Sequence, residues 1–203
     1  MLVAVVGASA IAYAALYLAH GFTKMTTVAL LGTLASLGFT ALLSQVVMGL
    51  ARISGFTTEE SLLLTLVPGQ LDIRGLVLSG VVLGALGAID DVTVTQASAV
   101  WELRAAAPTM QHGQLFRAGL RIGRDHVAST VNTLALAYAG ASMPLLVLFV
   151  LTEQPLGIVA NSEAVSTEIL RTLVGSIGLV ACVPITTWPA VRLAPSPEPT
   201  RSG

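Results

Sequence analysis

Long apolar stretches recur along this 203-residue chain, and they constrain its fold more than any other feature of the sequence. A helix needs about 20 mostly apolar residues to cross the hydrocarbon core of a bilayer. Stretches that approach or exceed this length lie at 1–19, 28–50, 75–96, 127–151 and 169–188. The sequence therefore predicts an all-α, polytopic transmembrane helix bundle with about five spans.

Composition leads to the same class. The chain is 54% hydrophobic and only 10% charged, whereas soluble domains carry roughly 25% charged residues. A formal net charge of -1 provides no basic field, so we expect the lipid bilayer and no nucleic acid as partner. The single cysteine, Cys182, excludes an internal disulfide and a Cys-rich metal pattern. We expect it to be a small buried packing residue, and we expect no metal and no other cofactor.

Polar segments separate the spans. The segment 58–67 opens with acids and has an apolar part too short to cross, which predicts one short interfacial or re-entrant helix. Residues 1–190 are predicted to form a single transmembrane domain, and the proline-rich end, 191–203, a disordered cytoplasmic tail. The other connections are read as loops, at 20–27, 105–117 and 152–167.

The basic residues predict an orientation. With five spans, seven of them fall on one side and three on the other. The first group is Lys24, Arg104, Arg117, Arg121, Arg124, Arg192 and Arg201, and the second is Arg52, Arg74 and Arg171. Basic loops stay in the cytoplasm. We therefore expect a cell-membrane protein with its N-terminus outside and its C-terminus in the cytoplasm, provided that 58–67 does not span.

The third span carries two adjacent acids, Asp90 and Asp91. On a helical projection Asp91 continues a stripe that contains Gly80, Gly84 and Gly87, whereas Asp90 lies on another line. Small residues let membrane helices approach closely. We therefore predict that the three glycines form a helix-packing face and that Asp91 points toward other helices, with Asp90 in the poorer environment.

Insertion free energies show that this span is not stable in the bilayer on its own. Each mid-membrane Asp costs about 2.5–3.5 kcal/mol, and the Leu, Ile and Val residues of the span return about 3–6 kcal/mol in total. The span thus requires partner helices, a protonated acid or nearby water. One interpretation makes Asp91, with Asp90, Thr95 and Gln96, part of a proton or cation pathway. The other pairs one Asp with an arginine of the next helix and places the second at the interface.

A second polar cluster precedes the fourth span. Arg121, Asp125 and Asn132 lie along one helical face, and Arg121 and Asp125 have the spacing of a helical ion pair. A plain interpretation is a solvated, positive-inside helix end. A sharper one is that Arg124 and Asn132 reach the stripe of α-helical positions that contains Asp91, so that the cluster lines the cytoplasmic mouth of a pathway.

His126, on a neighbouring line, is more often a polar interface residue than a proton relay. The chain has no zinc-protease, nucleotide-loop or serine-hydrolase motif. We therefore do not expect an enzyme.

Several segments have a distinctive sequence: 87–98 (GAIDDVTVTQAS), 123–126 (GRDH), 132–144 (NTLALAYAGASMP) and 167–178 (TEILRTLVGSIG). In this order they resemble the YibE/F family of bacterial multi-pass membrane proteins. The family is often described as permease-like, without an established substrate. Its acidic motif usually has one Asp after an apolar residue, and Asp91 takes that place, which makes Asp90 a departure. Family members tend to be longer, so the resemblance implies a C-terminal part or a shortened member.

Two hypotheses follow. The first is a permease-like transporter with Asp91, and Asp90 beside it, as the ionisable site. The alternative is a non-transporting membrane scaffold or accessory subunit in which Asp91 pairs with arginine. The absence of a detectable internal repeat favours the alternative, or a homo-oligomer or a partner membrane subunit, because many transporters contain repeats.

Overall fold

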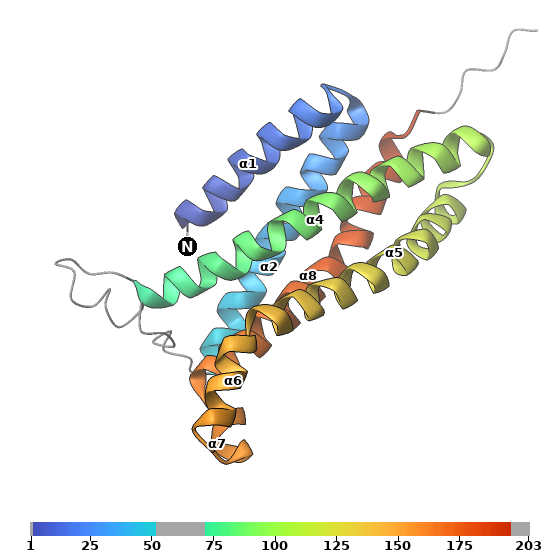
Figure 1. Cartoon of the computed structure of the whole chain (residues 1–203). Helices are drawn as coiled ribbons and strands as arrows, with labels where there is room; N and C mark the ends of the chain where they lie inside the picture. Colours follow the sequence, from blue (N-terminus) through green and yellow to red (C-terminus); the bar gives the residue numbers. More distant parts are fainter. Residues whose placement is uncertain (1, 52–71, 196–203) are drawn as a thin grey trace, which may run out of the picture.

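Helices make up all the regular structure in residues 2–51 and 72–195, the part of the chain that the computed structural model describes (Figure 1). They are α1 (Leu2–His20), α2 (Lys24–Ala51), α4 (Ile73–Ala106), α5 (His112–Ala141), α6 (Met143–Leu151), α7 (Leu156–Ala160) and α8 (Glu163–Leu193). Four helices are long and apolar enough to cross a membrane, and the bent pair of α5 and α6 makes a fifth candidate. The predicted all-α bundle is confirmed. The helix predicted at 58–67 lies outside the described residues.

Several helix ends differ from the predicted ones because capping residues start the helices earlier. α5 begins within the predicted loop 105–117, where Gln111 and Gln114 cap each other's backbone N–H groups. α8 begins within the predicted loop 152–167, where the Ser162 hydroxyl accepts a hydrogen bond from the Val165 N–H. These side chains satisfy the free donors of a first helical turn. The short α7 also lies in this predicted loop.

The fourth span is bent rather than straight. α5 ends at Ala141, and α6 continues at 45° to it. Pro144 occupies the first turn of α6, where a residue without an N–H group is tolerated but the preceding helix cannot continue unbroken. At the other end of the chain, α8 runs past the predicted boundary at 190 to Leu193. From residue 196 onward, the predicted tail lies outside the described residues.

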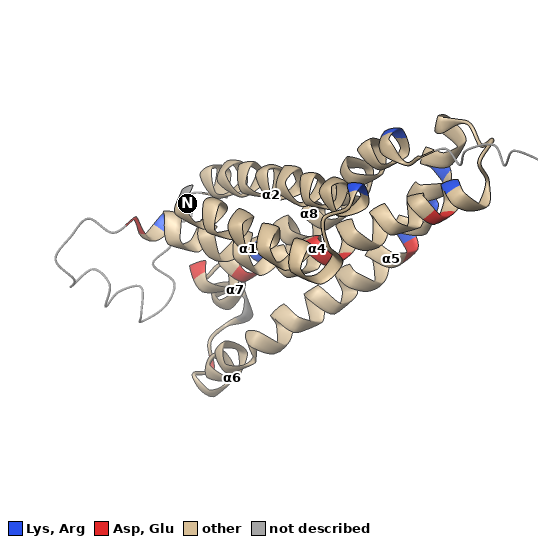
Figure 2. Ribbon diagram, turned by 90° about the horizontal axis from the view of Figure 1, so that it is seen from above, with Lys and Arg blue, Asp and Glu red and all other residues tan. Residues whose placement is uncertain are grey.

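α2, α4 and α8 pack together, α5 packs on α4 and α8, and α1 packs on α2 and α4. The end of α2 lies beside the beginning of α4, because Met48 shares a cluster of buried side chains with Leu78 and Val81. The opposite end of the bundle, where α4 connects to α5, collects most of the basic residues of the described part (Figure 2). This arrangement agrees with the grouping of charges used for the predicted orientation.

Close helix packing uses glycines other than the predicted ones. A Cβ atom on Gly32 of α2 would collide with Thr186 of α8, and one on Gly178 of α8 would collide with Thr40 of α2. Tight backbone approaches of this kind are typical of membrane helices. These two glycines therefore allow α2 and α8 to touch.

Gly80, Gly84 and Gly87 are exposed, so within the described chain no other helix packs closely on them, and their role as a packing face stays a prediction. No helix backbone approaches them, and the space beside Gly87 is open. α4 instead buries a neighbouring line of larger side chains. These are Val81, Val82, Ala85, Ile89, Val92 and Gln96. Over residues 80–89 both lines of α4 are free of charge, and packing against α2 and α8 selects the bulkier one.

Candidate functional site

Asp90 and Asp91 point to different sides of α4, because adjacent residues are about 100° apart around a helix. Asp90 is partly buried and faces α2, where the Thr33 hydroxyl donates to its Oδ1 atom at 3.3 Å. The Asp91 side chain is 69% exposed and faces α5. This reverses the predicted environments. The reason is the choice of packing face, since Asp90 borders the buried line of α4 and Asp91 continues the exposed glycine stripe.

The Asp90 side of the site is a cluster of oxygen atoms. Thr33 and Thr93 are fully buried, and their hydroxyls are 2.7 Å apart. The Thr93 hydroxyl also donates to the Asp90 carbonyl oxygen at 2.9 Å. Carboxylate, hydroxyl and carbonyl oxygens are ligands that suit a proton or a hard cation.

Sequence reasoning missed Thr33, although a signal was present. Hydroxyl residues recur along one face of α2 at spacings of three to seven, all of them fully buried. They are Thr26, Thr33, Ser36, Thr40 and Ser44.

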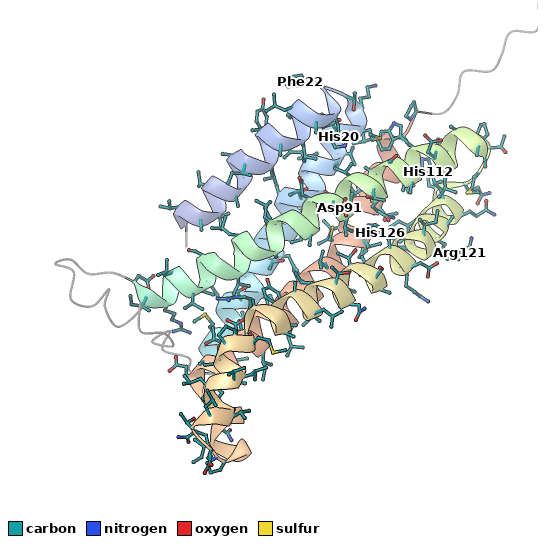
Figure 3. The ribbon with its side chains drawn as sticks, viewed as in Figure 1. His20, Phe22, Asp91, His112, Arg121 and His126 are labelled. Carbon is teal, nitrogen blue, oxygen red and sulfur yellow. The ribbon has the colours of Figure 1, made fainter. Side chains whose placement is uncertain are left out.

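On the other side of the site, Asp91 of α4 faces His126 of α5 (Figure 3). His126 Nε2 lies 3.7 Å from Asp91 Oδ2, which is an ion-pair distance but too long for a direct hydrogen bond. That nitrogen is buried and has no hydrogen-bond partner among the described residues.

Polar side chains continue beyond this pair along the open side of the glycine stripe. A Cβ atom on Gly84 would lie 2.9 Å from the Tyr138 hydroxyl oxygen, and one on Gly80 would lie 3.7 Å from Arg171 Nη2. Arg171 pairs with Glu168 at 2.8 Å. The Tyr138 hydroxyl and Arg171 Nε are buried without a partner in the described part of the chain. The stripe thus faces polar groups of α5 and α8, not another backbone.

The two predicted pathway residues after Asp91 have different surroundings. Thr95 is exposed, and its hydroxyl donates to the Asp91 carbonyl oxygen of its own helix. Gln96 is buried and donates to Gly119 O at 2.9 Å and to the Thr187 hydroxyl at 2.7 Å. Gln96 therefore joins α4 to both α5 and α8 and is positioned as a structural link.

The predicted mouth residues do not meet Asp91. Arg121, Arg124, Asp125 and Asn132 are all exposed. Within residues 2–51 and 72–195 no ion pair joins an arginine to Asp91, nor does Asn132 donate a hydrogen bond to it. A contact of Arg124 or Asn132 with the Asp91 stripe is thus not among the contacts of the described residues and stays a prediction. Arg124 is two residues from His126 and so lies about 200° around α5 from it.

The lone cysteine is buried, as predicted, and its Sγ atom lies 3.8 Å from the Ile89 carbonyl oxygen. No group of three His, Cys, Asp or Glu residues in the described ranges is arranged to hold a metal ion.

Comparison with known proteins yields one match. The sequence profile of the family described as YibE/F-like protein matches residues 1–196. Neither a curated protein nor a solved structure matches the chain.

Proposed function

This chain belongs to the YibE/F-like family, and from that premise we propose that it is a permease-like transporter that moves protons or small cations past Asp90 and Asp91. Its four or five candidate spans make it a membrane protein. In our proposal it resides in the cell membrane, with its N-terminus outside and its C-terminus in the cytoplasm, and it is not an enzyme.

The observation that carries this proposal is that two adjacent carboxylates near the middle of one long helix face two different neighbouring helices. Asp90 contacts the buried hydroxyl cluster, and Asp91 contacts His126 on the open side. Because the two carboxylates are about 100° apart on the surface of α4, an ion that leaves one can reach the other by passing around the helix. Ionisable groups within membrane-spanning helices are costly, and in membrane proteins they commonly mark ion pathways.

A non-transporting scaffold or accessory subunit is the second candidate, and one observation favours it. The stripe of Gly80, Gly84 and Gly87 is exposed and continues into Asp91, so a helix of a second copy or of a partner subunit has a small-residue face to pack on. The sequence-based version of this hypothesis pairs Asp91 with Arg121 or Arg124. Neither pair is among the ion pairs of the described residues.

Reconstitution tests the transport proposal. The purified chain in liposomes is given a pH gradient, or a Na⁺ or K⁺ gradient, and ion flux is followed with an entrapped dye. We expect flux above that of empty liposomes, and we expect Asp90→Asn and Asp91→Asn each to abolish it. Glu153→Gln is the matched control, because Glu153 is exposed and lies between α6 and α7, outside the helices that carry the two carboxylates and their contacts.

Wild-type flux in Asp91→Asn, or no flux in the wild type with any of these ions, would contradict the proposal. If Asp91→Asn instead lowered abundance or dissociated an oligomer, the scaffold hypothesis would be favoured.

A further inference from the structure

A groove of about 460 Å³ runs between α5 and α8. Its walls are apolar, with Val127 and Val131 on α5 and Val180 and Val183 on α8. In the described part of the chain, Arg124 is the only charged residue that lines it. Since Arg124 lies about 200° from His126 around α5, the groove is separate from the Asp91 side of the site.

The groove is open at its outer edge and closed on its inner side. Ala128 and Pro184 are exposed at its rim, and Val180 is 57% exposed. On the inner side α5 is held against its neighbours, because a Cβ atom on Gly123 would lie 2.5 Å from both Gln96 Oε1 and Val183 Cγ1. A ligand therefore enters from the surroundings of the bundle, which for a membrane helix are lipid.

The order of polar and apolar residues along the groove matches a phospholipid. α5 starts and α8 ends at the basic end of the bundle (Figures 1 and 2). Arg124 lies toward that end, and Val131 lies roughly 10 Å deeper along α5. A phospholipid in the leaflet at this end has its phosphate at the interface and its acyl chains directed toward the midplane. We propose that this groove binds an anionic phospholipid, with the phosphate at Arg124 and an acyl chain along the valines.

Charge explains the preference for an anionic lipid over a zwitterionic one. Arg117, Arg121 and Arg124 are exposed on α5 and form no ion pair within the described residues. Each basic side chain near an anionic membrane surface contributes to attraction. Arg117 and Arg121 do not line the groove, so they strengthen general attraction, whereas Arg124 contacts the bound headgroup. This site goes beyond the transport proposal and does not depend on it.

Native mass spectrometry of the full chain in detergent tests the site. The protein is titrated with phosphatidylglycerol and with phosphatidylcholine of the same acyl chains, and with glycerol phosphate as a headgroup without chains. We expect phosphatidylglycerol to bind more tightly than phosphatidylcholine. Arg124→Gln should weaken phosphatidylglycerol binding about fivefold, the loss expected for one basic contact, and Arg117→Gln should change it less than about twofold.

A second pair of variants tests the groove itself. Ala128→Phe fills the groove and should lower retention of both lipids, whereas Ala137→Phe, exposed on the same helix but outside the groove lining, should not. All four substituted residues are exposed, and gel filtration checks that each variant stays folded. Equal losses in Arg124→Gln and Arg117→Gln would overturn the proposal, as would wild-type binding in Ala128→Phe. Equally tight binding of glycerol phosphate would identify a free phosphate site instead and would also overturn it.

Discussion

Asp90 and Asp91 have the same chemistry and neighbouring positions, yet one helical step separates a buried hydroxyl cluster from an open polar side. Thr33 and Thr93 are fully buried, so their hydrogen bonds at Asp90 have no water to replace them. His126 and Asp91 are both partly exposed, and their contact is longer. Substitutions at Asp90, Thr33 or Thr93 should therefore lower the stability of the fold more than substitutions at Asp91 or His126.

We predict that Thr33→Val destabilises the protein by about 1 kcal/mol, because it removes one buried hydroxyl from the Asp90 cluster. Thr95→Val is the control, since the exposed Thr95 hydroxyl bonds only to its own helix; its effect should stay within about 0.5 kcal/mol. The midpoint of denaturant or thermal unfolding in detergent measures both. Equal midpoints for the two variants would show that the cluster contributes no stability.

Asp91→Asn should leave stability within about 0.5 kcal/mol of the wild type and should not reduce abundance in the membrane. The reason is that its carboxylate is 69% exposed and lies 3.7 Å from its nearest ion-pair partner, His126, and such exposed pairs contribute little. Quantitative immunoblotting and the unfolding midpoint measure the effect. A clear loss of abundance would speak for a structural partner of Asp91.

At the scale of helices, the close contact between α2 and α8 depends on two glycines, Gly32 and Gly178, which have no side chain to keep the helices apart. Gly32→Ala should destabilise the bundle by about 1–3 kcal/mol, because the new methyl group meets the whole Thr186 side chain, backbone-proximal atoms included. Gly87→Ala, with open space beside it, should be neutral or stabilise α4 by up to about 1 kcal/mol. The unfolding midpoint in detergent distinguishes these outcomes. Loss of an oligomer in Gly87→Ala would instead identify the exposed stripe as a subunit interface.

Element length and helical period were predictable from the sequence, and the helix ends were less so. Apolar stretches of bilayer length located each span, because the requirement for about 20 residues is independent of neighbours. The starts of α5 and α8 were missed because Gln111 and Ser162 act as caps inside segments that look like polar loops. The bend before α6 has a visible cause in Pro144, but its angle of 45° depends on packing.

For the molecule as a whole, the proposed orientation can be tested by cysteine labelling. In a Cys182→Ser background, His112→Cys places a thiol at the basic end and Glu153→Cys places one near α6 and α7. Both positions are exposed. We expect a membrane-impermeant maleimide to label Glu153→Cys in intact cells and His112→Cys only after permeabilisation. The reverse pattern would invert the orientation and place the phospholipid groove in the outer leaflet.

The sequence by itself determined the membrane class, the approximate spans and the family resemblance, and it singled out the acidic pair. These follow from hydropathy, length and motif, which do not depend on how helices pack. Tertiary structure alone decided that the glycine stripe stays exposed, that Asp90 faces Thr33 and that Asp91 faces His126 rather than Arg124. The physical reason is that helix faces toward lipid and toward other helices are equally apolar. Only the fit of side chains between neighbouring helices distinguishes one face of α4 from the other.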